Sequence, residues 1–259
     1  MQDSLTIIIP TLTNTKGIIY ELKVLSKYPV VVVDNAPSKE KKLASQKHGC
    51  CTYLPQSQNQ GFARAINLAF KYVRTSWICI LNDDIEFPSK LPLPELIRLA
   101  KKNHWDAISP VLIKKSGEVE NMGYHVLPIG RVKLVYDLRS TPHDLDGLTA
   151  ACLVMKSEIF RKLGGFDTRF FAYLEDIDLF LRLKRAGFHF GIAVDFQVIH
   201  NHMTTSRKMG NFKSFMDLRN WCLLIYKHWT LKMYLQYGPQ ILLERLRNIS
   251  GYLKVHTNG

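Results

Sequence analysis

The sequence predicts an α/β protein with a mostly parallel central sheet flanked by helices, followed by a helical tail. Two observations carry this prediction. In the first half of the chain, short apolar strands alternate with helical segments at spacings that suit βα units. Three of these strands end in polar residues, which is typical of the ligand-binding edge of an open parallel sheet.

The strands of the first half are apolar runs, and they lie at residues 5–9, 30–33, 51–54 and 78–81. The helical segments between them cover residues 17–27, 38–47 and 61–73. The strand at 30–33 is four consecutive valines, a β-branched run that suits a strand buried on both faces. Residues 106–136 show shorter strands and turns, and residues 144–154 lead from a loop into another apolar run.

Polar side chains follow three of the strands. They are Thr11, Asp34 and the triplet Asn82, Asp83 and Asp84. If the strands are parallel and adjacent, these side chains share one edge of the sheet. Two adjacent carboxylates there can hold a divalent cation, which can in turn hold phosphates, although adjacent acids also occur in ordinary turns.

Composition and charge narrow the function classes. The chain has 259 residues, 46% hydrophobic residues and a formal charge of +13, so we expect a globular protein with an anionic partner. The five cysteines form no CxxC pair, which favours reduced thiols and the cytoplasm. The first residues lack the basic start and the longer apolar core of a signal peptide, so we expect none. The sequence shows no apolar run of membrane-spanning length, no GxGxxG motif and no Walker loop.

A second acidic cluster lies at Glu175, Asp176 and Asp178, where a helix begins that runs to Arg185 and ends at Gly187. Acids in a first helical turn cap backbone N–H groups and complement the helix dipole. Three acids in four residues are more than a cap requires, so the cluster is also a candidate for proton transfer or substrate binding.

The tail from Met203 to Gly259 contains nine Lys or Arg residues and two acids. Its aromatic and aliphatic residues form two helical segments, which we expect to break at Gly238–Pro239. Basic residues with interfacial aromatics favour peripheral attachment to an anionic membrane, on the cytoplasmic face. An interface in a homo-oligomer and a helix packed on the sheet remain open as alternatives.

Six short motifs, in this order and spacing, resemble glycosyltransferase family 2, and in particular its rhamnosyltransferase-like branch. They span about residues 5–205 and are Thr6-Ile7-Ile8-Ile9-Pro10-Thr11, Val32-Val33-Asp34-Asn35, Asn59-Gln60-Gly61-Phe62-Ala63, Leu81-Asn82-Asp83-Asp84, Leu163-Gly164-Gly165-Phe166-Asp167 and Glu175-Asp176-Ile177-Asp178. The resemblance implies a GT-A catalytic domain over 1–205, with a nucleotide-sugar-binding half (1–105) and an acceptor-binding and catalytic half (106–205), before a basic, aromatic-rich tail at 206–259.

The resemblance also implies the reaction. It is a metal-dependent, inverting transfer from a nucleotide-diphosphate sugar, dTDP-rhamnose or a UDP-sugar, to a glycan or polyisoprenoid-linked acceptor. Synthesis of a bacterial surface polysaccharide is the expected setting, and no nucleic acid partner is expected.

The site residues that the resemblance implies fall into four groups. Asp176 is the general base, and Glu175 and Asp178 bind the acceptor. Asp84 and His200 hold the metal, Mg²⁺ or Mn²⁺. The nucleotide sugar is bound by Pro10, Thr11, Asp34, Asn59, Asn67, Asn82, Asp83, Arg207 and Lys208.

Two departures from the family pattern keep a different class of function open. Asn82 stands where relatives carry Asp, and Ile66 stands where many carry Arg. A catalytically silent glycan-binding or scaffold subunit would keep the fold without turnover. A nucleic-acid-binding protein would explain the charge, but it leaves both acidic clusters without a purpose.

Overall fold

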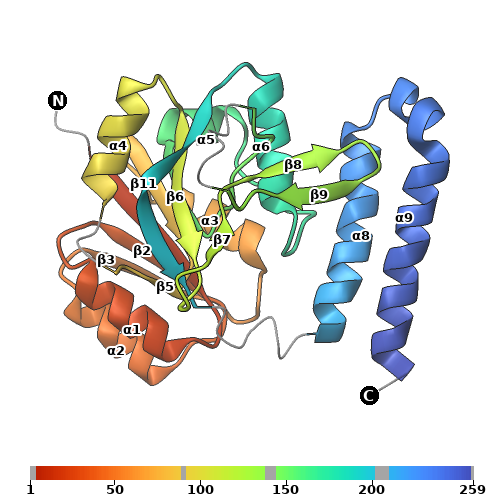
Figure 1. The fold of residues 1–259 in the computed structure, drawn as a ribbon. Coiled ribbons are helices and arrows are strands. Elements are labelled where there is room, and N and C mark those ends of the chain that lie inside the picture. The colour runs from red at the N-terminus through yellow and green to blue at the C-terminus, as the bar shows by residue number, and fades with distance from the viewer. Residues whose placement is uncertain (1–3, 89–91, 138–143, 202–209, 258–259) are drawn as a thin grey trace.

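The computed structural model describes residues 4–88, 92–137, 144–201 and 210–257 (Figure 1). Its main feature is one nine-stranded sheet with the strand order β3-β2-β1-β4-β10-β6-β11-β5 and with β7 paired to β6. The strands are β1 (Leu5–Thr11), β2 (Val30–Asp34), β3 (Cys51–Pro55), β4 (Trp77–Leu81), β5 (Ile85–Glu86), β6 (Ala107–Ile113), β7 (Val119–Asn121), β10 (Cys152–Lys156) and β11 (Phe190–His200). The predicted α/β class with a mostly parallel sheet is confirmed.

The first four strands form the parallel half of the sheet. Strands β2 and β4 both pair with β1 in parallel, and β3 pairs in parallel with β2. Every residue of β2 and β4 is buried, which accounts for their continuous apolar sequences. Because β1, β2 and β4 run in the same direction, Thr11, Asp34 and Asn82 lie toward one edge, as expected.

The second half of the sheet brings His200 to that same edge. Strand β10 is antiparallel to both β4 and β6, and β11 runs parallel to β6. The short β5 follows the Asp83–Asp84 turn and pairs antiparallel with the end of β11, where His200 lies opposite Ile85. His200 therefore lies beside Asp84, although 116 positions separate them in the chain.

Helices cover both faces of the sheet. One face packs against α1 (Thr15–Val24), α4 (Leu93–Lys102) and, through Ala44, α2 (Lys39–Lys47). The other packs against α3 (Phe62–Phe70), α5 (Ser157–Lys162) and α6 (Glu175–Arg185). Alternating residues of β1 feed the two cores, with Ile8 on the α3 side and Ile7 and Ile9 on the α1 side.

Two long helices, α8 (Gly210–His228) and α9 (Leu231–Thr257), stand beside this body as a pair (Figure 1). The hairpin of β8 (Tyr124–Leu127) and β9 (Arg131–Leu134) reaches toward α8. A third apolar cluster, which includes Tyr124, Ile177 and Trp221, joins the hairpin, α6 and α8. The tail is thus packed against the β8–β9 hairpin and α6.

The predicted break at Gly238–Pro239 is wrong, because α9 continues through Pro239 and the two helices separate at residues 229–230. A proline removes one backbone hydrogen bond, to the carbonyl four residues earlier. Pro239 and Leu235 are both exposed, so water can satisfy that carbonyl, and the interruption is tolerated. None of the helices in the described ranges is long and apolar enough to cross a membrane.

Candidate active site

A cavity of about 580 Å³ opens at the carboxyl ends of β1 and β4 and extends to the start of α6. Its wall comes from three parts of the chain that are distant in sequence. The lining includes Pro10, Thr11, Asn59, Asn82, Asp83 and Asp84 from the first half, Glu175, Asp176 and His200 from the second, and Phe212, Lys213 and Asp217 from α8.

The turn after β4 holds Asp83 firmly. Thr11 donates a hydrogen bond to Asp83 Oδ2 at 2.5 Å, and the Asn14 side-chain amide donates one to the Asp83 carbonyl at 2.5 Å. Gly17 is required nearby, because a Cβ there would collide with that same carbonyl. Burial raises the pKa of Asp83 to about 7, with the hydrogen bond from Thr11 opposing the rise and the charge of Asp84 adding to it.

Asp84 faces a histidine that a second carboxylate orients. Asp84 Oδ1 lies 3.3 Å from His200 Nε2, while His200 Nδ1 lies 2.9 Å from Glu120 Oε1. Burial disfavours the charged imidazole, but the nearby carboxylates of Asp84 and Glu120 outweigh it and raise the pKa of His200 to about 9. Glu120 lies on β7, and it fixes the ring so that Nε2 points at Asp84.

The pair of Asp84 and His200 fits a divalent cation. Asp84 Oδ1 is buried and accepts no hydrogen bond from the described residues. Two ligands at right angles and ~2.1 Å from Mg²⁺ lie ~3.0 Å apart, close to the observed 3.3 Å. Among the described residues, no group of three or more His, Cys, Asp or Glu side chains forms a metal site. A cation here would therefore share its remaining positions with diphosphate and water, as Mg²⁺ commonly does.

The helix α6 begins at the cavity, after an unusual turn. Tyr173 and Leu174 both have left-handed backbone conformations, with φ of 69° and 65°. Such residues store strain, and persist only where the surroundings hold them. Here the buried side-chain amide of Asn220, on α8, donates hydrogen bonds of 2.7 Å to the carbonyls of Ala172 and Tyr173.

Glu175 and Asp176 follow this turn and line the cavity side by side. Burial raises the pKa of both carboxyls, and the charge of Asp176 raises that of Glu175 further. Backbone N–H groups at Ile177 and Ala150 counteract part of the effect at Asp176. A carboxylate with a raised pKa is a stronger base than an ordinary aspartate and suits proton abstraction from a hydroxyl near neutral pH.

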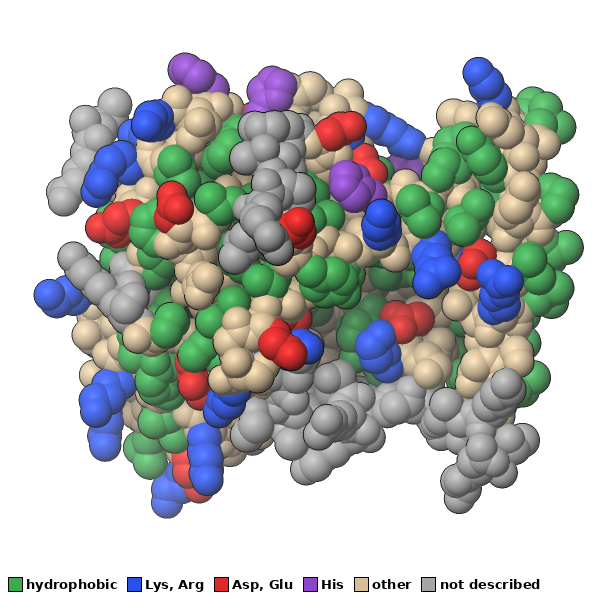
Figure 2. Space-filling model, viewed as in Figure 1, with side chains coloured by type: hydrophobic (Ala, Val, Ile, Leu, Met, Phe, Trp, Pro, Cys, Tyr) green, Lys and Arg blue, Asp and Glu red, His purple; other side chains and the backbone are tan. Residues whose placement is uncertain are grey.

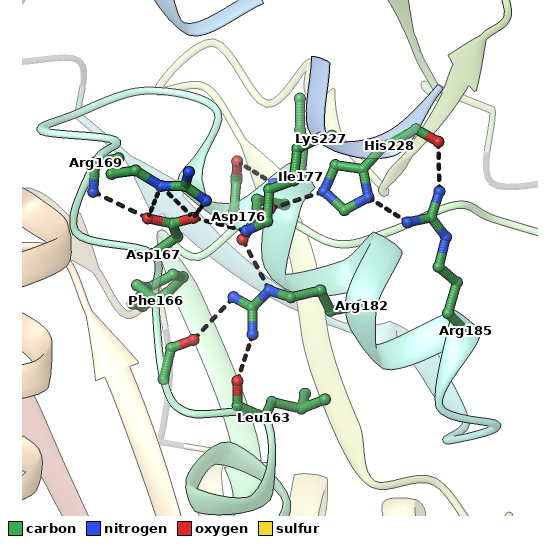
Figure 3. A network of polar contacts seen from close by, with 12 residues as sticks. Leu163, Phe166, Asp167, Arg169, Asp176, Ile177, Arg182, Arg185, Lys227 and His228 are labelled. Atoms are coloured by element: carbon green, nitrogen blue, oxygen red, sulfur yellow. Dashed lines mark hydrogen bonds and ion pairs between the residues drawn. The ribbon is translucent and has the colours of Figure 1, made fainter. Parts of the chain in front are cut away.

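Asp178 does not line the cavity and belongs to a network that joins α6 to α8. Figure 3 shows its partners Arg182, Lys227 and His228. Asp178 accepts a hydrogen bond from Arg182 at 2.8 Å and lies 2.6 Å from Lys227 Nζ and 2.7 Å from His228 Nε2. Arg185 donates to His228 Nδ1, which places the ring proton on Nε2, facing Asp178. Burial opposes the charge of Asp178, but the bond from His228 and the two cations outweigh it and lower the pKa.

The family model described as "Glycosyl transferase family 2" matches residues 6–164, more than half of the chain. The chain belongs to glycosyl transferase family 2. Its rhamnosyltransferase-like character is confirmed by relatives. The "N-acetylglucosaminyl-diphospho-decaprenol L-rhamnosyltransferase" of Mycobacterium tuberculosis is 23% identical over 206 residues, which cover 66% of this chain and 66% of that protein.

Two further comparisons extend the match. The "Low-salt glycan biosynthesis hexosyltransferase Agl10" of Haloferax volcanii is 25% identical over 234 residues, covering 85% of this chain and 75% of that protein. Among solved structures, mannosyltransferase PcManGT from Pyrobaculum calidifontis, in complex with GDP-Man and Mn²⁺, has a TM-score of 0.65 at 16% identity and covers 98% of this chain and 75% of that one. The structural likeness shows the shared GT-A fold.

This family 2 glycosyltransferase assembles most of the residues predicted for its site. Nine of them line the cavity: Pro10, Thr11, Asn59, Asn82, Asp83, Asp84, Glu175, Asp176 and His200. Arg207 and Lys208 lie outside the described residues. The three others, Asp34, Asn67 and Asp178, do not line the cavity.

Those three side chains contact other protein groups. Asp178 is fully buried in the network with α8. The carboxylate of Asp34 is also buried, and Lys41 Nζ at 2.5 Å and Tyr53 Oη at 2.7 Å bind it. Asn67 bonds both backbone groups of Phe166 and supports that segment from behind.

Sequence reasoning missed three residues that shape the site. Glu120 lay 80 positions from its histidine without a motif to mark it. Asn220 and Lys213 lay in the tail, where only the excess of basic residues drew notice. Lys213 lines the cavity, pairs with Asp217 at 2.5 Å and lies 4.8 Å from the centre of the Tyr173 ring. It is the described cation best placed to meet an anionic ligand there.

Proposed function

We propose that this glycosyltransferase catalyses an inverting transfer of a hexosyl group from a nucleotide-diphosphate sugar to a hydroxyl of a glycan or polyisoprenoid-linked acceptor. One observation carries the proposal. A single cavity is lined both by Asp83, Asp84 and His200 and by Glu175 and Asp176. The first group suits a cation-bound diphosphate, and the second suits a base acting on an acceptor.

In this proposal Asp176 accepts the proton of the acceptor hydroxyl as the hydroxyl oxygen bonds to the anomeric carbon. The bond between that carbon and the diphosphate oxygen breaks on the opposite face, which inverts the configuration. Glu175, held mostly protonated by burial and by its neighbour, is a donor for another acceptor oxygen. Lys213 and Phe212, both on α8, form part of the cavity wall.

Asp84 and His200 would hold Mg²⁺ or Mn²⁺, and Asp83 and Asn82 would contact the nucleotide part of the donor. When bound, the cation supplies positive charge against the departing diphosphate. The neighbour that was solved with GDP-Man and Mn²⁺ supports the use of a divalent cation. As donors we propose dTDP-rhamnose or a UDP-sugar, since relatives include rhamnosyltransferases, and as setting the assembly of a bacterial surface polysaccharide.

The test is thermal stabilisation of the protein by a panel of nucleotide sugars, dTDP-rhamnose, UDP-sugars and GDP-mannose, with and without Mn²⁺. We expect one donor class to raise the melting temperature, and Mn²⁺ to increase the shift. Asp176→Asn should retain this shift and lose transfer. Donor binding with no turnover by the wild type on any offered acceptor would favour a silent glycan-binding subunit, and no shift with any sugar would refute the donor site.

A further inference from the structure

Helix α9 carries a row of exposed apolar side chains along its whole length. Its members are Leu231, Leu235, Leu242, Leu246, Ile249 and Leu253, which are 39–78% exposed. At 100° per residue these six positions fall within ~60° of arc around the helix. Figure 2 shows hydrophobic side chains following one another along the edge of the molecule formed by α9. We call these six residues the α9 stripe.

The α9 stripe is not the surface by which the helix joins the protein. Ile241 is buried, and Met233 and Tyr237 pack beside it in the cluster that includes Trp221 and Leu224 of α8. Met233 and Tyr237 lie on the opposite side of the helix from the stripe, and Ile241 lies ~110° from the centre of the stripe. The helix therefore has two apolar faces. One packs against α8, and the other, the α9 stripe, is exposed.

The charges near the α9 stripe indicate which kind of partner can cover the stripe. At 100° per residue Lys232 lies ~40° beyond one edge of the stripe and Arg247 lies ~100° beyond the same edge; both side chains are exposed. The single acid of α9, Glu244, is nearly buried and already meets Arg247 at 3.0 Å and Arg131 at 3.8 Å. Among the described residues α9 thus presents exposed leucines and cations and offers no exposed carboxylate.

A second copy of the chain would set these cations against one another without acids to pair with, in a protein that already carries +13. An anionic lipid surface meets both features, since acyl chains take up the leucines and headgroups pair with Lys232. We propose that α9 is an interfacial helix that lies on an anionic membrane through the α9 stripe. This inference concerns a surface outside the cavity and does not depend on the identity of the donor.

The geometry suits a helix that lies on the membrane. With 27 residues, α9 extends ~40 Å, and the stripe follows it from the first turn to the last described side chains. It has no membrane-spanning window among its described residues. Its partner α8 supplies Phe212, Lys213 and Asp217 to the cavity wall, so membrane contact would bring that wall close to an acceptor held in lipid.

The experiment is co-sedimentation of the full chain with vesicles of phosphatidylcholine containing ~30% phosphatidylglycerol, and with vesicles of phosphatidylcholine alone. We expect binding to the anionic vesicles and at least tenfold weaker binding to the neutral ones. The double variant Leu242→Asp/Leu246→Asp should weaken binding to anionic vesicles at least tenfold. Lys232→Glu, which leaves the apolar stripe intact, should weaken it to a smaller extent.

The matched control is Leu43→Asp/Tyr72→Asp, which places the same charges at two exposed apolar positions outside the tail. Its affinity for the anionic vesicles should stay within twofold of the affinity of the wild type. Far-UV circular dichroism and donor-induced thermal shifts establish that each variant is folded. Equal binding by the stripe variant and the wild type would overturn the proposal. So would a wild type that ignores vesicles and forms a dimer that the stripe variant cannot form.

Discussion

Asn220 offers the most direct test of how the tail supports the active site. Its side-chain amide donates to the carbonyls of Ala172 and Tyr173, immediately before the left-handed Tyr173–Leu174 turn that presents Asp176. Asn220→Ala removes both donors from a fully buried position. Asn220→Asp keeps the shape but turns a donor into an acceptor that repels the same carbonyls.

The magnitude follows from the two carbonyls that lose their donor. A buried polar group left without its partner costs ~1–3 kcal/mol, so Asn220→Ala should lower the free energy of unfolding by ~2–6 kcal/mol if the turn stays in place. Asn220 Oδ1 also accepts a hydrogen bond from Arg219 at 2.7 Å, and water can replace that bond because Arg219 is exposed. If the turn relaxes instead, each left-handed residue releases ~1–3 kcal/mol of strain and the stability loss shrinks. Relaxation would move Asp176, and a displacement near 1 Å can reduce the rate ~100-fold.

The assays are denaturant unfolding and steady-state kinetics with the donor identified by thermal shift. We expect the kcat of Asn220→Ala to fall ~10–100-fold while donor affinity stays within about threefold, because the residues expected to bind the donor lie on other elements. Asn103→Ala is the control, since that exposed amide also donates to a helix carbonyl, at 2.9 Å from Leu99 O, but far from the cavity. Wild-type stability together with wild-type kcat in Asn220→Ala would refute the positioning role.

Three other predictions concern single groups. Because burial raises the pKa of Asp176 and the base must be deprotonated, kcat/KM should fall as the pH drops through a value above the usual aspartate range near 3.8, and an acid limb at or below 3.8 would contradict this. Glu120→Gln should weaken Mn²⁺ binding ~10–100-fold in calorimetry, whereas Glu118→Gln, an exposed neighbour, should leave it unchanged. Lys41→Met should cost ~3–5 kcal/mol of stability in urea unfolding by stranding a buried carboxylate, and the exposed Lys42→Met should stay within ~0.5 kcal/mol.

The sequence was sufficient to predict the sheet and its binding edge, for a physical reason. Strands buried on both faces must be apolar along their whole length, so β2 and β4 stood out as runs bounded by polar residues. Parallel pairing then places their ends together, which is why Asp83 and Asp84 were found at the cavity. The opening of α6 was predictable too, since its acids precede an apolar helical pattern.

The contacts between side chains were not predictable in the same way. Asp34 ends a strand at the binding edge, but Lys41 and Tyr53 occupy its carboxylate, and no pattern in the sequence pairs those three residues. Asp178 lies two positions after Asp176, and a helix turns by ~200° over two residues, so the two carboxylates face opposite sides. The contacts of Asp178 could not be predicted, because its partners Lys227 and His228 lie on the distant helix α8.

The tail therefore does more for this enzyme than its charge suggests. Near its beginning α8 contributes Lys213 to the cavity wall, in its middle Asn220 holds the turn before Asp176, and at its end His228 binds Asp178. A shift of α8 would move all three at once, because they lie on one rigid helix. If α9 lies on a membrane, the surface on which the enzyme rests is linked through α8 to the geometry of its proposed base.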